Sequence, residues 1–255
     1  LSAFFPEPFV PFLPEIEAAG VVFTNNGKTE DMLTTSKTAG CNTIRIRLWK
    51  DPAIGNSGLT EVKTLAQRVK KAGLKVWLTV HYSDDWADPA VQTTPTAWKN
   101  LSFTDLKAAV ASYTTTILTE INPDIIQIGN EINTGLLWPQ GHLINQEAQC
   151  IDLLKTMSTT IRSKAPSTKI MIHYAGVSAT DTNWFFTKVK SVDYDYIGLS
   201  YYPIWHGKDL ATIKTTIDAL GKNFSKKVLI AETAYPFTLG FNDWTNNIVG
   251  LDSQL

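Results

Sequence analysis

The chain has 255 residues, of which 44% are hydrophobic and 18% are charged, so it can bury one large core or two small ones. Lysine and arginine total 23, and aspartate and glutamate total 24. This near-neutral balance argues against nucleic acid or an anionic membrane surface as the main partner. No apolar run is long enough to span a bilayer.

Apolar or β-branched runs alternate with amphipathic stretches along the chain, which predicts strands alternating with helices. In chain order, the expected helices are 29–39, 60–72, 104–120, 145–163 and 208–221, and the expected strands are 43–48, 76–80, 125–129, 169–172, 196–199 and 228–231. Thr60 is a candidate N-cap for the second helix, and Gly73 follows its end. This alternation predicts crossover units and a parallel sheet that is buried on both faces.

Two α/β architectures fit such a pattern, a doubly wound sheet and an eight-stranded barrel. A dinucleotide-binding sheet should carry a glycine fingerprint after an early strand, and a nucleotide triphosphatase should carry a GxxxxGK loop. The sequence contains neither. We therefore expect a (β/α)8 TIM barrel.

Polar and aromatic residues follow the predicted strands at their carboxyl ends. In a barrel these ends meet at one mouth, where active sites lie. The candidates are Arg45, Arg47, His81, Asn130, Glu131, His173, Tyr201, Tyr202 and Glu232.

Glu131 and Glu232 follow the fourth and seventh barrel strands if one weak strand precedes residue 43. Those two strands lie across the mouth from each other, so two carboxyl groups can face a bound substrate. Glycoside hydrolysis requires such a pair, one protonated and one ionised. The alternative is that each glutamate forms a structural ion pair with Arg45 or Arg47, which lie on the same face of their strand.

Five segments resemble one glycosidase family: NTIRIRLWKDP (42–52), VHYSDDWADPAVQ (80–92), QIGNEINTGLLWPQG (127–141), YIGLSYYPIWHG (196–207) and IAETAYPF (230–237). They are similar to the arabinogalactan endo-β-1,4-galactanases of glycoside hydrolase family 53, in the clan of retaining (β/α)8 glycosidases. The resemblance implies an endo-acting retaining enzyme that cleaves β-1,4-galactosidic bonds in galactan or type I arabinogalactan by double displacement. It also implies that no cofactor is required and that the enzyme is a monomer acting on plant cell-wall galactan. Because that polymer is too large to enter a cell, we expect an extracellular, cell-surface or periplasmic location.

The resemblance also implies roles for individual residues. Glu131 would be the acid/base, Glu232 the nucleophile, and Asn130 the ligand of the sugar 2-hydroxyl. Arg45 or Arg47 would keep the nucleophile ionised, and the sequence leaves open which of the two does so. Tyr201 or Tyr202 would hydrogen-bond the nucleophile; adjacent strand residues face opposite ways, so we expect only one of them in the site.

The remaining candidates lie in loops at the mouth. In YSDDWADP (82–89), Trp86 would stack on a sugar ring and Asp85 would bind hydroxyls, although Asp85 is equally suited to a turn. Trp205 is a second stacking candidate. His81 and His173 fit neutral hydrogen-bonding partners better than metal ligands, because the chain has four histidines and neither an HxH nor an HExxH motif.

The sequence departs from the family at its ends, since no eighth strand is visible after Glu232. We expect residues 1–255 to be a single catalytic barrel domain that is trimmed at both ends. Asn242 and Asp243, in the tail, supply oxygen atoms suited to a structural calcium ion, although a plain polar loop is the favoured interpretation.

Two alternative functions remain. One is an endo-mannanase, xylanase or cellulase of the same clan, because the two glutamates alone do not separate these enzymes. The other is a non-catalytic carbohydrate-binding barrel, which would keep the tryptophans but need not keep both glutamates. A Schiff-base aldolase is disfavoured because Lys75, Lys169 and Lys227 lie at the amino ends of strands.

Overall fold

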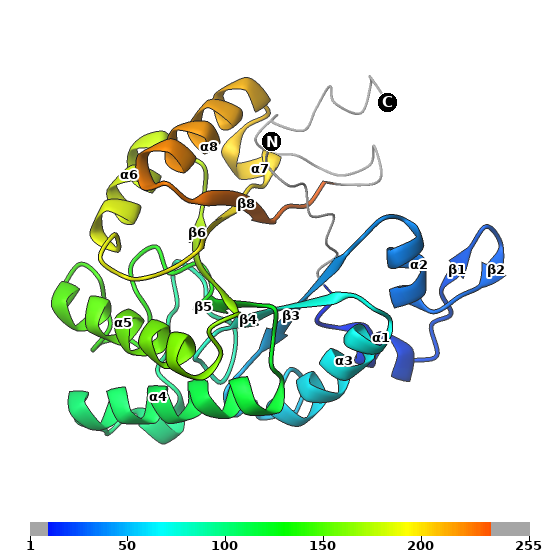
Figure 1. Ribbon diagram of the computed structural model, residues 1–255, viewed down its shortest axis with the longest axis horizontal. Helices are drawn as coiled ribbons and strands as arrows, with labels where there is room; N and C mark the ends of the chain where they lie inside the picture. The colour runs from blue at the N-terminus through cyan, green and yellow to red at the C-terminus, as the bar shows by residue number, and fades with distance from the viewer. Residues whose placement is uncertain (1–9, 236–255) are drawn as a thin grey trace.

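The computed structural model describes residues 10–235, and its centre is one parallel sheet with the strand order β3-β4-β5-β6-β7-β8. The sheet curls, and the main helices cover its outer side (Figure 1). The strands are β3 (Thr43–Leu48), β4 (Lys75–Val80), β5 (Ile125–Ile128), β6 (Lys169–Ala175), β7 (Tyr196–Ser200) and β8 (Lys227–Glu232). All six predicted strands are confirmed, in the arrangement expected of a (β/α) barrel. The two calcium candidates, Asn242 and Asp243, lie outside the described residues.

Helices connect successive strands of the sheet, and all of them were predicted except the one between β6 and β7. They are α3 (Leu59–Lys71), α4 (Phe103–Glu120), α5 (Glu147–Lys164), α6 (Ala179–Lys188) and α8 (Leu210–Phe224), with short helices η1 (Thr96–Trp98) and α7 (Pro203–His206) in two of the loops. Thr60 was wrong as an N-cap, because α3 begins one residue earlier and is capped by Gly58. Gly73 does end this helix, with a φ of 77° that suits glycine. Within residues 10–235, no helix combines the length and apolar character needed to cross a membrane.

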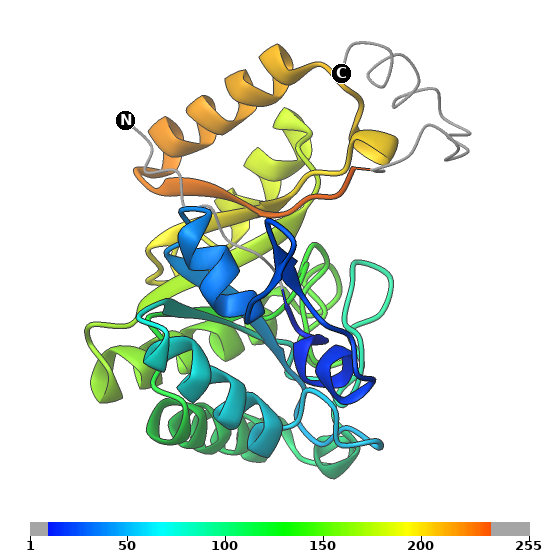
Figure 2. The same cartoon turned by 90° about the vertical axis from the view of Figure 1, so that its right-hand side faces the viewer.

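The first part of the described chain packs beside the sheet rather than in it (Figures 1 and 2). It contains α1 (Leu13–Ala18), a hairpin of β1 (Thr24–Asn25) and β2 (Lys28–Thr29), and α2 (Met32–Thr38). The backbone N–H of Val10 donates to the carbonyl of Arg45 at 3.1 Å, so Val10 lies alongside β3.

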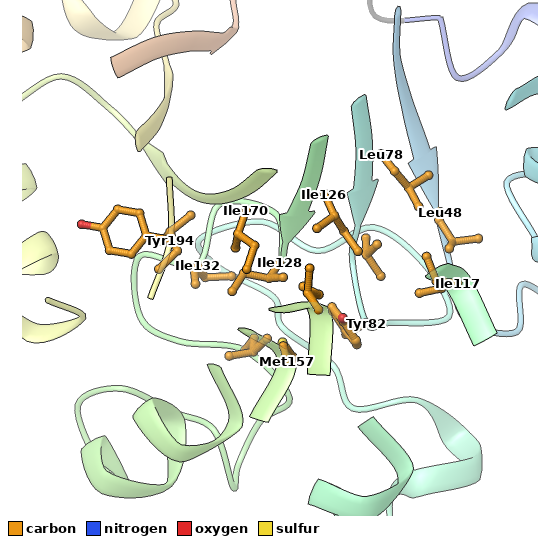
Figure 3. Packing of buried hydrophobic residues seen from close by; sticks show 14 of the residues in the cluster. Leu48, Leu78, Tyr82, Ile117, Ile126, Ile128, Ile132, Met157, Ile170 and Tyr194 are labelled. Carbon is orange, nitrogen blue, oxygen red and sulfur yellow. The ribbon is translucent and has the colours of Figure 1, made fainter. Parts of the chain in front are cut away.

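Two apolar clusters lie on opposite faces of the sheet, because successive side chains of a strand point to opposite sides. The larger cluster fills the space between the sheet and the helices, and Figure 3 shows part of it, including Leu78, Ile126 and Met157. The smaller cluster lies inside the curl. It consists of Trp77, Ile125, Met171 and Ala231. The polar side chains of the strands lie on the same inner face, nearer the carboxyl ends of the strands than this apolar cluster.

The pairing of β7 with β8 contains a one-residue register shift. Leu199 pairs with Ile230, but Ser200 pairs with Glu232 rather than with Ala231. Regular alternation would turn Glu232 to the same side as Ile230, towards the helices. The bulge instead lets both Ala231 and Glu232 face the inside of the curl, and bulges commonly re-aim a side chain in this way.

Candidate active site

Glu131 is presented by a tight turn directly after β5. Gly129 has a φ of 89°, and a Cβ atom on it would lie 2.5 Å from Cγ2 of Ile132, so the turn requires glycine there. Glu131 itself has a φ of 49°. A left-handed backbone is costly for a residue with a side chain and is found preferentially at functional sites. This conformation turns Asn130 and Glu131 towards the mouth of the curled sheet.

Glu232 lies across the mouth, and both of its carboxylate oxygens accept hydrogen bonds. Nη2 of Arg45 donates to Oε1 at 2.9 Å, and the hydroxyl of Tyr202 donates to Oε2 at 2.9 Å. Burial opposes ionisation of this carboxyl group, but the charge of Arg45 and the two donors outweigh it and lower its pKa below the usual range. Glu232 is therefore ionised at neutral pH, as a nucleophile must be.

Glu131 has the opposite environment. Burial, and next the negative charge of Glu232, raise its pKa from 4.5 to about 7, while a hydrogen bond from Ser200 lowers it in part. One carboxylate oxygen of Glu131 and one of Glu232 lie within 4.8 Å of each other. Carboxyl groups of retaining glycosidases are about 5 to 5.5 Å apart, whereas those of inverting enzymes are about 6.5 to 9.5 Å apart. The spacing and the two pKa directions fit a retaining acid and nucleophile pair.

A buried polar cluster supports both glutamates from below. Arg45 donates not only to Glu232 but also to Oε1 of Gln127 and to Oδ1 of Asn130, at 3.1 and 3.2 Å from its Nη2. Asn130 also donates to the carbonyl of Ala87 at 2.9 Å, which fixes the orientation of its amide. Asn130 thus precedes Glu131 and shares Arg45 with Glu232, and its contact with a sugar 2-hydroxyl stays a prediction.

His173 lies inside β6, fully buried between the two glutamates. Its Nδ1 is 2.9 Å from Nε2 of Gln127 and 3.3 Å from the backbone nitrogen of Glu131, and its Nε2 is 3.0 Å from Oγ of Ser200. Burial lowers its pKa to about 3, so the imidazole is neutral. It is thus a hydrogen-bonding partner of the site, as predicted.

Arg47 does not reach the nucleophile, which settles the choice between the two arginines in favour of Arg45. Its guanidinium donates to Oγ of Ser57 at 2.9 Å. It also lies 4.0 Å from the ring centre of Trp49, 4.1 Å from that of Trp86 and 4.7 Å from that of Phe12. These rings line a cavity of about 530 Å³ beside the mouth. Arg47 fixes the walls of this cavity by cation–π contacts.

Of the other candidates in or near the loop 82–89, Trp86 and Asp85 line the cavity, and His81 stabilises the loop. Trp86 is 47% exposed and lines the cavity. Asp85 also lines it, but its Oδ1 accepts the backbone N–H of Trp86 at 2.7 Å, which is a turn contact. His81 is buried, with Nδ1 accepting the N–H of Ala87 at 3.1 Å, so it holds the loop that carries Trp86.

Tyr202 and Trp205 lie together at the carboxyl end of β7. Trp205 is 69% exposed, and its ring packs edge-on against Tyr202 with the ring centres 5.0 Å apart. Tyr201 points away, because its hydroxyl donates to the carbonyl of Gly207 at 2.9 Å. The backbone N–H of Tyr201 donates to the carbonyl of Glu232 at 2.8 Å, but of the two tyrosine side chains it is Tyr202 that contacts the carboxylate.

A metal ion needs clustered ligands, and among the described residues Glu131, His173 and Glu232 come close enough to hold one. Both ring nitrogens of His173 already contact protein groups, however, and Glu232 is bound by Arg45 and Tyr202. A cation would have to displace these contacts, so the cluster fits acid–base chemistry better than metal binding.

Three supporting residues were given no role in the prediction from the sequence. Gln127 is a single polar side chain in an apolar strand, and that contrast was a usable signal. Ser200 ends a strand beside the two tyrosines but carries no charge or ring to mark it. Gln92 donates to the carbonyl of Asn130 at 2.8 Å from a distant loop, and no sequence pattern points to it.

Comparison with known proteins agrees with this geometry. Residues 10–255 match the profile of glycosyl hydrolase family 53. An arabinogalactan endo-β-1,4-galactanase of Thermothelomyces thermophilus is 36% identical over 238 residues, which are 87% of this chain and 71% of the relative. A family 53 catalytic domain of Ignisphaera aggregans has a TM-score of 0.89 at 36% identity, covering 96% of this chain and 72% of the other. A structure from a study of two fungal β-1,4-galactanases has a TM-score of 0.87 at 31% identity, covering 93% and 76%. The chain belongs to glycosyl hydrolase family 53.

Proposed function

We propose that the chain is an endo-acting retaining hydrolase of β-1,4-galactosidic bonds in galactan and type I arabinogalactan. The observation that carries this proposal is the pair Glu131 and Glu232, with nearest oxygens within 4.8 Å and pKa values moved in opposite directions. The choice of galactan as the substrate is supported by the relatives that are named as arabinogalactan endo-β-1,4-galactanases.

In the first step, the ionised Glu232 attacks the anomeric carbon of the sugar. Arg45 and Tyr202 hold both of its oxygens, so the carboxylate keeps one orientation and stays charged. Protonated Glu131 gives its proton to the glycosidic oxygen as the bond to the leaving chain breaks. A galactosyl ester of Glu232 results, with inverted configuration at the anomeric carbon.

In the second step, Glu131 is ionised and removes a proton from water. The water oxygen attacks the anomeric carbon, the ester bond to Glu232 breaks, and the second inversion restores the original configuration. The raised pKa of about 7 suits a group that must act first as an acid and then as a base near neutral pH. Two carboxyl groups complete the cycle, so we propose that the reaction needs no cofactor.

Endo action requires an open cleft that binds the chain on both sides of the cleaved bond. Trp86 and the cavity beside it lie in the loop after β4, and the exposed Trp205 lies in the loop after β7. Indole rings stack well on the apolar faces of galactose. We propose that these tryptophans bind galactosyl units on opposite sides of the scissile bond.

The polymer substrate also bears on where the enzyme acts. Galactan chains do not cross membranes, so we propose that the enzyme acts at the cell surface, outside the cell or in a periplasm. We propose a monomer, since one chain carries both carboxyl groups.

Product release from linear β-1,4-galactan tests the proposal, with mannan, xylan and cellulose as controls. Short galacto-oligosaccharides from galactan alone are expected, and proton NMR recorded at once should show the β-anomer as the first product. Glu232→Gln serves as the control for contaminating activity. Cleavage of mannan, xylan or cellulose in preference to galactan would support the other clan activities. A folded chain that binds galactan without cleaving it would support a carbohydrate-binding barrel.

A further inference from the structure

Ser200 contacts the acid/base and has no role in the mechanism above. It ends β7, is fully buried, and places Oγ within hydrogen-bonding distance of both Oε1 of Glu131 and Nε2 of His173. A hydroxyl group has a single hydrogen to donate. Which partner receives it decides what Ser200 does to Glu131.

The surroundings of His173 fix the direction of these hydrogen bonds. Its Nδ1 accepts the backbone N–H of Glu131, whose hydrogen position is set by the peptide plane. Nε2 of Gln127 also lies 2.9 Å from Nδ1, and it donates to the carbonyl of Gly129 and to Oδ1 of Asn130 as well. Oδ1 of Asn130 is 3.2 Å from Nδ1, but it already accepts from Arg45 and Gln127, whereas the N–H of Glu131 has Nδ1 as its acceptor. Nδ1 therefore carries a lone pair. In a neutral imidazole the hydrogen then lies on Nε2.

The hydrogen on Nε2 is donated to Oγ of Ser200, and the serine hydroxyl in turn donates to Oε1 of Glu131. The chain of donors thus runs from Gln127 and the Glu131 backbone through His173 and Ser200 to one chosen oxygen of the carboxyl group. Gln127, His173 and Ser200 lie in strands β5, β6 and β7, and the backbone N–H of Glu131 lies in the tight turn directly after β5.

We propose that Ser200, oriented by the neutral His173, is a positioning residue that reserves Oε1 of Glu131 as a hydrogen-bond acceptor and leaves Oε2 to carry the transferred proton. In the first step the proton leaves Oε2 for the glycosidic oxygen as the C–O bond breaks. In the second step Oε2 takes a proton from the attacking water. Ser200 and His173 keep their own protons throughout, so the balance of the reaction is unchanged.

This assignment rests on the proposed function for its catalytic part, but it also predicts a property of the carboxyl group itself. A donor to Oε1 stabilises the ionised form of Glu131 more than the protonated form. Removing the hydroxyl should therefore raise the pKa of Glu131 and leave its proton distributed over both oxygens. Proton delivery to a poor leaving group should suffer most.

The test compares Ser200→Ala with Ser158→Ala. Ser158 is a buried serine that donates to the carbonyl of Asp193, on α5 and away from the mouth, so it controls for the loss of any buried hydroxyl. The pKa of Glu131 is measured by carbon-13 NMR titration of glutamate-labelled protein, with the signal assigned from Glu131→Gln. We expect a rise of about one pH unit in Ser200→Ala and none in Ser158→Ala. An unchanged pKa in Ser200→Ala would overturn the proposal, even if the chain cleaved no polymer.

The kinetic arm uses kcat/KM on two aryl β-galactosides, one with a phenol and one with a dinitrophenol leaving group. Ser200→Ala should lose about 10- to 100-fold on the phenyl galactoside, part of the usual range for acid catalysis. It should change little on the dinitrophenyl galactoside, which needs no proton. Equal losses on both would mean that Ser200 is only structural. If the alanine variant does not fold, Ser200→Cys, whose thiol is a weak donor, should show the same pattern to a smaller extent. If the unsubstituted chain is inactive on galactan and on both galactosides, the proposed function fails, and the titration alone decides this inference.

Discussion

Tyr202→Phe removes one of the two side chains that hold the nucleophile. The tyrosine hydroxyl donates to Oε2 of Glu232 at 2.9 Å, and Arg45 donates to the other oxygen. A hydrogen bond to a charged group is worth about 1.5 to 3 kcal/mol, and one pKa unit corresponds to about 1.4 kcal/mol. The pKa of Glu232, which is depressed in the native enzyme, should therefore rise by about one to two units.

The assay is the pH dependence of kcat/KM on an aryl β-galactoside. Activity requires ionised Glu232, so a higher pKa moves the acidic limb of the profile to higher pH. Tyr201→Phe is the matched control, because its hydroxyl donates to the carbonyl of Gly207 instead, and its acidic limb should not move. An acidic limb that is unchanged in Tyr202→Phe, or that moves equally in both variants, would refute the reasoning.

Three further predictions concern the same mouth. The pKa of Glu131 is raised in the folded state, so its stabilising contribution is present below pH 4.5 and lost as the pH rises through about 7. Glu131→Gln should thus raise the free energy of unfolding by about 3 kcal/mol at pH 8 and leave it unchanged at pH 4, as urea titrations would show; equal effects at both pH values would contradict the burial of its charge. Glu232→Ala should regain activity with azide and yield the inverted α-galactosyl azide, and a β-azide or no rescue would remove it as the nucleophile. Trp205→Ala should raise KM for galactan by up to about 10-fold, given about 0.5 to 1.5 kcal/mol for a stacking contact, while kcat/KM on an aryl galactoside stays within about twofold; equal losses on both substrates would place Trp205 at the cleaved sugar.

The strands were predictable because each is a short apolar run between helical stretches. A strand that is buried on both faces needs apolar side chains at nearly every position, so its sequence pattern is easy to recognise. Helix α6 was not predicted, although Ser178 caps it by accepting the N–H of Asp181. Its ten residues mix threonine, asparagine and aromatic side chains, so its periodicity is weak. A capping signal would have been the better guide than the spacing of apolar residues.

The pair of glutamates was predictable because an ionisable acid directly after a buried strand must be paired, hydrogen-bonded or used in catalysis. The choice between Arg45 and Arg47 was not predictable, because the two lie on the same face of β3 and are only two residues apart along the strand. The structure separates them through their neighbours: Arg45 is level with Gln127 and Glu232, whereas Arg47 reaches Ser57 and the tryptophans. Contacts between distant strands leave no mark in either local sequence.

The register shift between β7 and β8 makes this enzyme sensitive to insertions and deletions in β8, an effect that substitutions would not reveal. Glu232 faces the mouth only because one extra residue is accommodated opposite Ser200. Removing Ala231 would leave Glu232 directly after Ile230 and still on the inner side, whereas a one-residue insertion or deletion between Lys227 and Ile230 would exchange the two faces of the strand. The first part of β8 should therefore accept exchanges of apolar side chains but not changes in length. In contrast, the exposed loops around Trp86 and Trp205 should tolerate gains or losses of residues that spare Ala87, which fixes Asn130, and Tyr202, which holds Glu232. Insertions and deletions in those loops give a route to new chain specificities on an unchanged reaction.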